Sequence, residues 1–217
     1  FINTMMENKW LGSKTGQGFY KKEGKEIKVL DLNTLEYRAS KKTSFATLEL
    51  TKTIDKVIDR FKVLASGKDK AGAFYRKNFA GMFEYVSNRI PEISDELYKI
   101  DDAMKAGFGW EHGPFQIWDA IGVEKGIEIM KAEGLKPAEW VNDMLASGNS
   151  SFYTVKNGAT YAYDIPKKSQ EKIPGQDAFI ILDNIRKSNE VFKNSGVVIE
   201  DLGDGILNCE FQSKMNT

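Results

Sequence analysis

The sequence feature that most constrains the fold is a 3.6-residue repeat of apolar side chains, which runs from about residue 44 to residue 148. Such a repeat is typical of helices that bury one face. Glycine or proline closes each stretch, as is common where helices end. We expect Thr43 or Ser44 to cap the first helix and Ser94 to cap the third. The pattern predicts helices over 44–66, 74–90, 94–107, 123–133 and 137–146, with a short helix from Pro114 in between.

After residue 150 the pattern changes to short segments typical of strands. Segments 152–155 and 160–163 flank Asn157-Gly158, a dipeptide that favours a two-residue hairpin turn. Segments 197–199 and 206–211 indicate a second hairpin across the Gly-Asp-Gly turn at 203–205. The polar stretches 21–28 and 167–176 are expected to be a connector and a linker. Together these patterns predict a mainly α fold, a helical bundle with one or two short β-hairpins.

The composition excludes several classes of protein. The 31 Lys and Arg residues balance the 31 Asp and Glu residues, so the chain has no electrostatic footprint for nucleic acid or an acidic membrane. No apolar run reaches the roughly 20 residues of a membrane span, and no signal peptide is recognisable. The single cysteine, Cys209, leaves no intramolecular disulfide and fits a reducing compartment. We expect a cytoplasmic protein without nucleic-acid or membrane partners.

Both ends of the sequence lie inside patterns that belong to secondary structure. Ile2, Met5 and Met6 already follow a helical spacing, and the strand-like segment 206–211 lies six residues before the last position. Domains commonly end in exposed, polar linkers. We therefore expect the chain to be a fragment of a longer protein.

Few side chains in the sequence could carry catalysis. His112 is the only histidine, and it has no second histidine or nearby cysteine with which to form a metal site. We interpret it as a peripheral, structural residue. Cys209 has no histidine near it in the sequence and is not expected to be a nucleophile. Paired carboxylates such as Asp101-Asp102 are expected to lie on solvated helix faces.

Two glycine clusters, 12–18 and 107–113, invite a nucleotide-binding interpretation. A dinucleotide fingerprint follows a strand and opens a helix, whereas a helix is predicted before Gly107. The first cluster lacks a lysine and Ser/Thr placed as in a phosphate loop. We interpret both clusters as tight turns that let two stretches of backbone approach closely.

The predicted helix start at Gly113-Pro114 is a candidate anion site. Free N–H groups in a first helical turn can hold a phosphate or a carboxylate. Trp110, Phe115 and Trp118 could flank an apolar ligand there. Each of these aromatic residues could instead belong to the core, and for each residue considered singly we favour this alternative.

The two glycine clusters also carry a resemblance to a known family. Residues 11–20, Leu-Gly-Ser-Lys-Thr-Gly-Gln-Gly-Phe-Tyr, resemble the L-G-x-K-T-G-x-G-F-Y signature of 3-hydroxyacyl-CoA dehydrogenases. Residues 100–122 are similar to the family's pattern I-D-x-A-M followed by G-x-G-W-x-x-G-P-F-x-x-x-D-x-x-G. The two motifs occur in the family's order, and the resemblance covers about residues 1–165.

The resemblance implies a division into domains. In multifunctional members the first signature closes one helical domain, and a second helical domain follows. Residues 1–25 would be the tail of a first helical dehydrogenase domain, 26–40 a connector, 41–165 a second helical domain of the family's C-terminal type, and 166–195 a linker. Residues 196–217 resemble the truncated start of an enoyl-CoA hydratase (crotonase-like) domain.

The resemblance also implies a function. The family oxidises L-3-hydroxyacyl-CoA with NAD in fatty acid β-oxidation. Its NAD site and catalytic His–Glu pair lie in an upstream Rossmann domain, in an N-H-F-x-N-P context that this sequence lacks, so His112 does not take over the catalytic role. The chain is expected to be inactive alone, to bind no cofactor and no metal, and to contribute to the acyl-CoA cleft and to a homodimer interface. The cleft or interface candidates are Lys14, Gly109, Trp110, His112, Gly113, Pro114, Phe115 and Asp119.

Two other interpretations remain open at this point. The same helices and turns would serve a non-catalytic helical dimerisation or scaffold module. A free-standing CoA-binding protein is a third interpretation, and the expected truncation at both ends argues against it.

Overall fold

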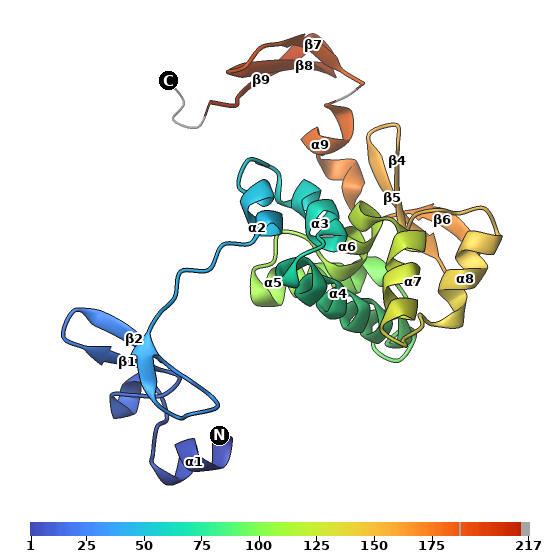
Figure 1. Cartoon of the computed structure of the whole chain (residues 1–217). Helices are drawn as coiled ribbons and strands as arrows, with labels where there is room; N and C mark the ends of the chain where they lie inside the picture. Colours follow the sequence, from blue (N-terminus) through green and yellow to red (C-terminus); the bar gives the residue numbers. More distant parts are fainter. Residues whose placement is uncertain (187, 214–217) are drawn as a thin grey trace. The chain divides into compact units, whose positions relative to one another are not determined.

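A computed structural model describes residues 1–186 and 188–213 of the chain. It contains two compact units, Phe1–Ser44 and Phe45–Thr217. Figure 1 labels the helices and strands of both units.

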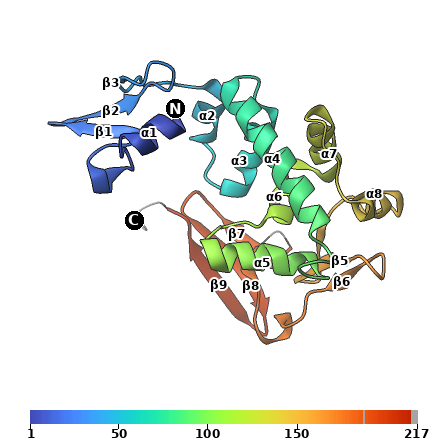
Figure 2. The same cartoon turned by 90° about the horizontal axis from the view of Figure 1, so that it is seen from below.

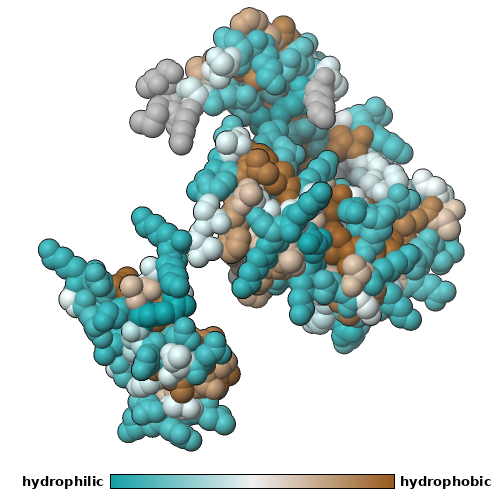
Figure 3. Space-filling view, in the orientation of Figure 1, coloured by the Kyte–Doolittle hydropathy of each residue, from teal (hydrophilic) through white to brown (hydrophobic). Residues whose placement is uncertain are grey.

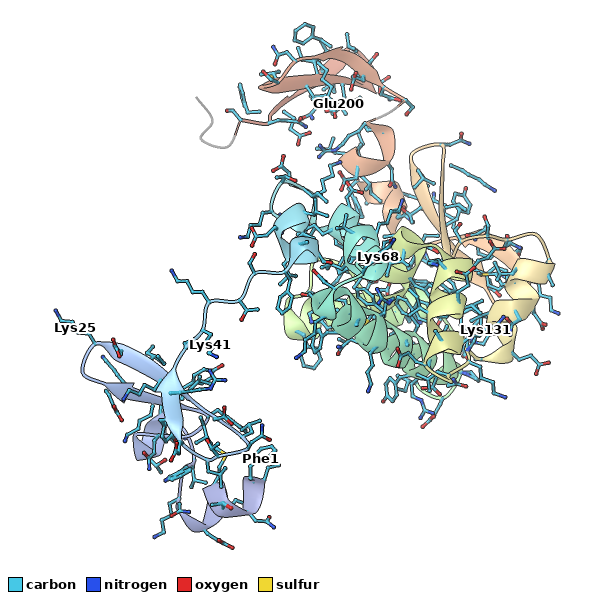
Figure 4. The ribbon with its side chains drawn as sticks, viewed as in Figure 1. Phe1, Lys25, Lys41, Lys68, Lys131 and Glu200 are labelled. Carbon is cyan, nitrogen blue, oxygen red and sulfur yellow. The ribbon has the colours of Figure 1, made fainter. Side chains whose placement is uncertain are left out.

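The first unit holds one short helix and one antiparallel sheet. Helix α1 spans Ile2–Glu7, the 3-10 helix η1 spans Ser13–Thr15, and strands β1, β2 and β3 span Tyr20–Glu23, Glu26–Leu30 and Tyr37–Ala39. β2 is the central strand and pairs with both others. The stretch 21–28, expected to be a connector, therefore lies mainly in the β1–β2 hairpin, at whose turn Lys25 is labelled in Figure 4.

The first glycine motif, 11–20, is a turn that brings two stretches of backbone together. Gly12 and Gly16 have φ angles of 106° and 79°, which favour glycine. A Cβ on Gly18 would lie 2.8 Å from the Cα of Gly12. The hydroxyl of Thr15 accepts the N–H of Leu11 at 3.0 Å and so closes the turn. The predicted tight turn with closely approaching backbones is confirmed at this motif.

The second unit contains the predicted helical block. Its helices are α2 Ala46–Thr51, α3 Val57–Ser66, α4 Lys70–Asn88, α5 Leu97–Phe108, α6 Pro114–Ile121, α7 Val123–Ala132 and α8 Glu139–Ala146. α4 is the longest described helix, and α7 lies alongside it in both views (Figure 1 and Figure 2). Gly134 and Gly148 follow α7 and α8 with φ angles of 73° and 86°, a conformation common at helix ends.

The segment predicted as one helix from residue 44 is in fact two helices, α2 and α3. The hydroxyl groups of Thr51 and Thr53 donate to the carbonyl oxygens of Leu48 and Leu50 at 2.8 and 3.1 Å. Side-chain hydrogen bonds of this kind compete with the helical ladder. The chain accordingly leaves the helix after α2 and resumes it at Val57.

Asp69 caps two helices at once. It is the N-cap residue of α4, where its carboxylate accepts the N–H of Gly72 at 2.9 Å. The same carboxylate accepts the N–H and the hydroxyl of Thr47, in the first turn of α2, at 2.9 and 2.7 Å. The hydrogen bonds from Gly72 and Thr47 lower the pKa of Asp69 to about 2. Asp69 thus takes the capping role that was predicted for Thr43 or Ser44.

Helix α5 departs from the prediction at both ends. Its N-cap residue is Glu96, and Ser94 lies two residues earlier, where its hydroxyl accepts the N–H of Glu96 at 3.2 Å. The helix continues through Gly107 and ends at Phe108, and its C-cap residue Gly109 has a left-handed φ angle of 66°.

The core of the second unit is built on aromatic rings of α4 and α6. Phe79 and Phe83 of α4 stack at 5.9 Å, and Phe83 stacks on Trp118 of α6 at 4.6 Å. Phe152 packs edge-on against Phe115 and Trp118, each at 5.0 Å. Phe115 and Trp118 are fully buried, so the core interpretation of these two aromatic residues is confirmed.

Two three-stranded antiparallel sheets follow the helices in the sequence. One consists of β4 Tyr153–Lys156, β5 Ala159–Asp164 and β6 Ser169–Lys172, and the other of β7 Glu190–Lys193, β8 Val197–Gly203 and β9 Ile206–Phe211. The 3-10 helix η2, Gln176–Ala178, and the short helix α9, Leu182–Ile185, lie between them in sequence. Asn157 and Gly158 have φ angles of 50° and 73°, as a type I′ turn requires. The two predicted hairpins are β4–β5 and β8–β9.

The predicted fold class, a helical bundle with one or two hairpins, is wrong. Each hairpin gains a third strand and the first unit adds a sheet, so the described residues form three three-stranded antiparallel sheets as well as the helices. Among the missed strands, β1, β6 and β7 are edge strands with charged or polar residues: Tyr-Lys-Lys-Glu, Ser-Gln-Glu-Lys and Glu-Val-Phe-Lys. Edge strands of this kind carry charged side chains and lack the apolar alternation that predicts a strand. The stretch 167–176, predicted as a linker, contains β6.

Candidate functional site

The second glycine motif is organised around a buried carboxylate on α5. Asp101 is 1% exposed, and its carboxylate accepts the backbone N–H groups of Phe115 at 2.9 Å and Gln116 at 3.0 Å. These N–H groups lie in the first turn of α6, where they have no partner within their own helix. Asp101 therefore caps α6 from a neighbouring helix.

Gly113, the N-cap residue of α6, makes this close approach possible. A Cβ on Gly113 would lie 2.3 Å from the Cβ and 2.4 Å from the Cα of Asp101, whereas ordinary contacts are 3.4–4 Å. The side chain of Gln116 accepts the N–H of Gly113 at 3.0 Å. Pro114 follows at the first helical position, where a missing N–H costs nothing. The predicted helix start at Pro114 is confirmed, and Gly113 is the residue that allows α5 and α6 to meet.

A second carboxylate of the motif joins α6 to the β4–β6 sheet. Asp119 accepts the N–H groups of Phe152 and Tyr153, both at 2.8 Å. The hydroxyl of Tyr153 donates to Asp101 at 2.9 Å. Two acidic side chains and one tyrosine thus tie α5, α6 and β4 together.

Burial changes the proton affinity of these groups. Desolvation raises the pKa of Asp101 to about 6, against the effect of the hydrogen bonds that its carboxylate accepts. Desolvation raises the pKa of Asp119 to about 7, and the nearby charge of Asp101 acts in the same direction. Burial also raises the pKa of Tyr153 far above its ordinary value, so its hydroxyl keeps the proton that it donates to Asp101.

These contacts overturn two expectations about the motif. Asp101 and Asp102 were both expected on a solvated face, but only Asp102 is exposed. The N–H groups at the start of α6 were a candidate site for a phosphate or a carboxylate. Asp101 supplies that carboxylate from within the chain, so the start of α6 is not an open anion site.

Two apolar hollows flank Trp110, which is 38% exposed. The first, the α3–α4 hollow, has a volume of about 510 Å³. The second, the α4–α5 hollow, has a volume of about 520 Å³. Met82 of α4 lines both, as Trp110 does, and both volumes fall in the range of small-molecule pockets. Figure 3 shows apolar residues, in brown, reaching the surface in separate patches among hydrophilic ones.

Four of the candidate residues lie on or at the start of α6. Gly113, Phe115 and Asp119 make the internal contacts described above, and Phe115 is fully buried. Pro114 is buried as well and lines the α4–α5 hollow. The structure brings these four together as a packing centre.

The other four candidates are dispersed. Trp110 and His112 line the α3–α4 hollow, and the Nε2 atom of His112 lies 3.5 Å from the carboxylate of Glu111. Gly109 is exposed at the end of α5 and lines neither hollow. Lys14 is exposed in η1 of the first unit.

The described residues offer neither a metal cluster nor a membrane-spanning helix. No group of three or more His, Cys, Asp or Glu side chains among residues 1–186 and 188–213 could hold a metal ion. No helix within these ranges combines enough length with enough apolar character to cross a membrane.

Asp101 and Tyr153 were not among the candidates predicted from the sequence. A signal for Asp101 was available, because it follows Leu97 by four residues and so shares the face of α5 that Leu97 buries completely. No comparable signal exists for Tyr153, whose partner Asp101 lies 52 positions away in the chain.

A model of a known family matches the part of the chain that contains this packing centre. The family model described as 3-hydroxyacyl-CoA dehydrogenase, C-terminal domain, matches residues 92–161, from the segment before α5 into β5. The matched range contains Asp101, Gly113, Asp119 and Tyr153, the residues that tie α5, α6 and β4 together.

Comparison with curated proteins extends the similarity along the chain. A Bacillus subtilis (strain 168) protein named a probable 3-hydroxyacyl-CoA dehydrogenase is 39% identical over 217 residues, 100% of this chain and 27% of that protein. A Rickettsia felis protein, named as a fatty acid oxidation complex trifunctional enzyme, is 30% identical over 122 residues, 54% of this chain and 15% of that protein.

No solved structure matches the chain. The chain spans only 15% to 27% of the length of these two relatives. Within it, residues 92–161, 70 of the 217 residues, match the 3-hydroxyacyl-CoA dehydrogenase C-terminal domain.

Proposed function

We propose that this chain is part of an NAD-dependent 3-hydroxyacyl-CoA dehydrogenase that acts in fatty acid oxidation. The observation that carries the proposal is the 39% identity to the Bacillus subtilis protein over all 217 residues, which include both glycine motifs. The name of the Rickettsia felis relative supports a place in fatty acid oxidation.

In this proposal the chain supplies the acyl-CoA side of the enzyme. The family's reaction removes a hydride and a proton from the CH–OH group of the substrate, and NAD accepts the hydride. The two hollows beside Trp110 are apolar and of the size of small-molecule pockets, which suits a role next to a fatty acyl chain. Their position on the packed α4–α5–α6 framework would keep such a surface rigid.

The residues described here do not fit an NAD site. Every strand pairing among the described residues is antiparallel, whereas the dinucleotide fold is built from parallel βαβ units. Neither glycine motif joins a parallel strand to a helix. We place the NAD site and the catalytic His–Glu pair in a Rossmann domain upstream of this chain.

The proposal keeps the domain division expected from the resemblance. Residues 1–25 and 26–40, the tail of a first helical domain and a connector, share the β1–β2–β3 sheet. The second helical domain, 41–165, shares a sheet with β6 of the following segment, 166–195, so we place the linker after β6. Residues 196–217 are the start of a crotonase-like domain. The name of the Rickettsia felis relative, a trifunctional enzyme, supports such a fusion.

A non-catalytic dimerisation or scaffold role is the second candidate, and the exposed apolar residues of the second unit favour it. Phe74 and Tyr85 on α4 are 63% and 58% exposed, and Phe108 at the end of α5 is 75% exposed. Large apolar side chains exposed in this way are common at protein interfaces. An interface role in a homodimer is compatible with both candidates.

The reaction can be tested by following NADH formation. We expect the purified chain to produce no NADH from NAD and 3-hydroxybutyryl-CoA, and the longer protein with its upstream region to produce NADH. NADH formation by the chain alone would overturn the assignment of the catalytic groups. Absence of NADH from the longer protein would overturn the dehydrogenase proposal.

Calorimetric titration separates the substrate-side role from the scaffold role. A CoA thioester such as acetoacetyl-CoA is expected to bind the longer protein, and substitution of Trp110 by Ala is expected to weaken that binding. Gly107→Ala is the matched control, because Gly107 lies in the same motif but is exposed with nothing within 4 Å of the position of an added Cβ. Equal affinity in both variants would favour the scaffold role.

A further inference from the structure

The β7–β8–β9 sheet has two faces of opposite character. In an antiparallel sheet, directly opposed residues of neighbouring strands point to the same side, and successive residues of one strand alternate between sides. The strand pairing therefore defines an inner face, whose residues are Val198, Glu200, Asn208 and Glu210. It also defines an outer face, whose apolar residues are Phe192, Val197, Ile199, Leu207, Cys209 and Phe211.

The inner face is buried, although it is the more polar of the two. Val198 and Glu200 are 3% and 0% exposed. The carboxylate of Glu200, labelled in Figure 4, accepts the side-chain N–H of Asn208 at 2.7 Å, and its Oε1 atom is buried without a hydrogen-bond partner among the described residues. Arg186, which follows α9, pairs through Nη1 with the carboxylate of Glu210 at 2.7 Å. These contacts fix which face of the sheet points inward.

The outer face is apolar and open to solvent. Phe192, Leu207 and Phe211 are 50%, 59% and 66% exposed, and Cys209 is exposed as well. Asp201, opposite Leu207 at one end, is the charged residue of this face. Large apolar side chains from all three strands thus lie together on one surface.

This arrangement reverses the usual order of a two-sided sheet. Antiparallel sheets commonly pack their apolar face on a core and turn their polar face to water. Contiguous exposed apolar surface marks a place where another protein surface packs. A sheet buries its apolar face by acquiring a second layer of helices or strands. The outer face is therefore the side of the sheet on which a core has still to form.

Two surfaces could supply that second layer, a later part of the longer protein or a second copy of this chain. The Bacillus subtilis relative is matched by all 217 residues but over only 27% of its own length, so 73% of it (100% minus 27%) lies outside the match. A segment joined directly to β9 stays near the outer face at an effective concentration of about 1 mM, whereas a second copy must arrive from solution. Elements that are consecutive in sequence are also usually adjacent in space. Both points favour the longer protein's own chain.

We propose that the outer face of the β7–β8–β9 sheet binds the segment of the longer protein that follows residue 217. The two surfaces meet through apolar side chains and form one core. The proposal rests on the proposed continuation of the chain into a crotonase-like domain, and it adds the surface on which that domain is built. Because β7 pairs with β8 and carries Phe192 of the outer face, the domain begins at β7 rather than at residue 196.

Cys209 reports directly on whether the outer face is covered. It is the only cysteine of the 217 residues, and it lies on this face opposite Ile199. N-ethylmaleimide is added to the 217-residue chain and to the longer protein, and the labelled peptide that contains Cys209 is quantified over time by mass spectrometry. Because a thiol must be accessible to react, we expect labelling to be about tenfold or more slower in the longer protein. Equal rates in the two proteins would overturn the proposal.

Ser195→Cys is the matched control for the labelling. Ser195 is exposed in the turn between β7 and β8, in the same sheet but off its outer face. We expect this position to be labelled at the same rate in the 217-residue chain and in the longer protein. Equal slowing at positions 195 and 209 would overturn the proposal, because the protection would then not be confined to the outer face.

A substitution on the outer face tests whether apolar contact provides the protection. In the longer protein, Leu207→Asp buries a charge in the proposed core, so we expect the labelling of Cys209 to become as fast as in the 217-residue chain. In the 217-residue chain the same substitution lies in solvent and should leave the circular dichroism spectrum and Tm unchanged. Leu207→Ala, which adds no charge, should accelerate labelling in the same direction if Leu207→Asp prevents the longer protein from folding.

Ile27→Asp is the matched control for this substitution. Ile27 lies on β2 of the first unit and is 60% exposed, against 59% for Leu207. We expect Cys209 to stay protected in the longer protein that carries Ile27→Asp. Protection that survives Leu207→Asp, or that is lost equally in both variants, would overturn the proposal.

The other occupant of the outer face would be a second copy of the chain. Light scattering that shows a dimer of the 217-residue chain, dissociated by Leu207→Asp and with Cys209 protected in the dimer, would overturn the proposal in favour of self-association. Labelling is measured without NAD and without turnover. A negative NADH assay therefore leaves this proposal standing, and equal labelling in a longer protein that forms NADH overturns this proposal alone.

Discussion

Substitution of Gly113 by alanine tests the contact between α5 and α6 on which the second glycine motif depends. The added Cβ would lie 2.4 Å from the Cα and 2.3 Å from the Cβ of Asp101. Ordinary contacts begin at 3.4 Å, and backbone atoms cannot move aside as a flexible side chain does. The two helices would have to separate by about 1 Å, which is 3.4 Å minus 2.4 Å.

The cost of that separation follows from the hydrogen bonds at the contact. Asp101 accepts the N–H groups of Phe115 and Gln116 at 2.9 and 3.0 Å, and a shift of this size would stretch both bonds beyond their useful range. Forcing an extra methyl group into a packed interior costs about 1–3 kcal/mol, and weakened hydrogen bonds to a buried carboxylate add a similar amount. We expect Gly113→Ala to lower the free energy of unfolding by about 3–5 kcal/mol.

The measurement is thermal and urea unfolding of the purified variant, followed by the helical circular dichroism signal. For a domain of this size the expected loss corresponds to a drop in Tm of roughly 6–20 °C. Gly107→Ala is the matched control, because this glycine lies in the same motif, in α5, and a Cβ there meets nothing within 4 Å. The control should be neutral or gain about 0.5–1 kcal/mol, since alanine favours a helix more than glycine does.

If the free energy of unfolding of Gly113→Ala lies within about 1 kcal/mol of that of the unsubstituted chain, the reasoning is refuted, because alanine then fits without separating the helices. A double-mutant cycle with Asp101→Ala sharpens the test. If the loss arises at this contact, the two substitutions together should cost clearly less than the sum of their separate effects. Additive effects would show that the damage occurs elsewhere.

Three further predictions concern the same region. Gly126→Ala places a Cβ 2.1 Å from the indole Nε1 atom of Trp118, so we expect the free energy of unfolding in urea to fall by about 1–3 kcal/mol. An unchanged urea midpoint would contradict the close contact between Gly126 and Trp118. Asp119→Asn places an amide NH2 group against one of the two backbone N–H groups, of Phe152 and Tyr153, that the carboxylate now accepts. We expect the free energy of unfolding to fall by about 1–3 kcal/mol and the hydrogen-exchange rate of the Tyr153 N–H to rise. Burial raises the pKa of Asp101 to about 6 and that of Asp119 to about 7, so both carboxyl groups bind a proton more tightly in the folded state than in the unfolded state. The stability gained from these two protons is complete below about pH 4 and declines as the pH rises through 6 and 7. The free energy of unfolding should therefore fall less between about pH 4.5 and 7.5 in Asp119→Asn than in the unsubstituted chain, and equal slopes would refute the assigned proton affinity.

Local patterns predicted much of the helical block. The helix start at Pro114, the glycines after α7 and α8 and the Asn157-Gly158 turn all depend on backbone preferences of a few neighbouring residues. Such preferences act over a few neighbouring residues, so they can be predicted from the sequence. The cap of α2 was predicted wrongly because it is not local: Asp69, which accepts the hydroxyl of Thr47, lies 22 positions away in the chain.

The candidate site was predicted less well than the helices. The second glycine motif was recognised, and the core interpretation of Phe115 was correct, but Asp101 was expected in solvent. Whether a carboxylate on a helix faces water or an orphan N–H group depends on the neighbouring helix, which the local pattern does not contain. The polar strand β6 was missed for a related reason, since its pairing with β5 satisfies the backbone and leaves little apolar signal.

The sequence by itself determined the approximate positions of α4, α6, α7 and α8, the tight turns and the family resemblance, because each depends on residues close together in the chain. The tertiary structure decided what the motif residues do. Gly113 allows two helices to meet, Asp101 caps one helix from the other, and Asp119 holds a strand. These roles come from contacts between residues 12 to 52 positions apart, since Asp101 must meet Gly113 as well as Tyr153. A buried carboxylate is stable only where such distant donors converge on it, and that convergence is a property of the packed fold.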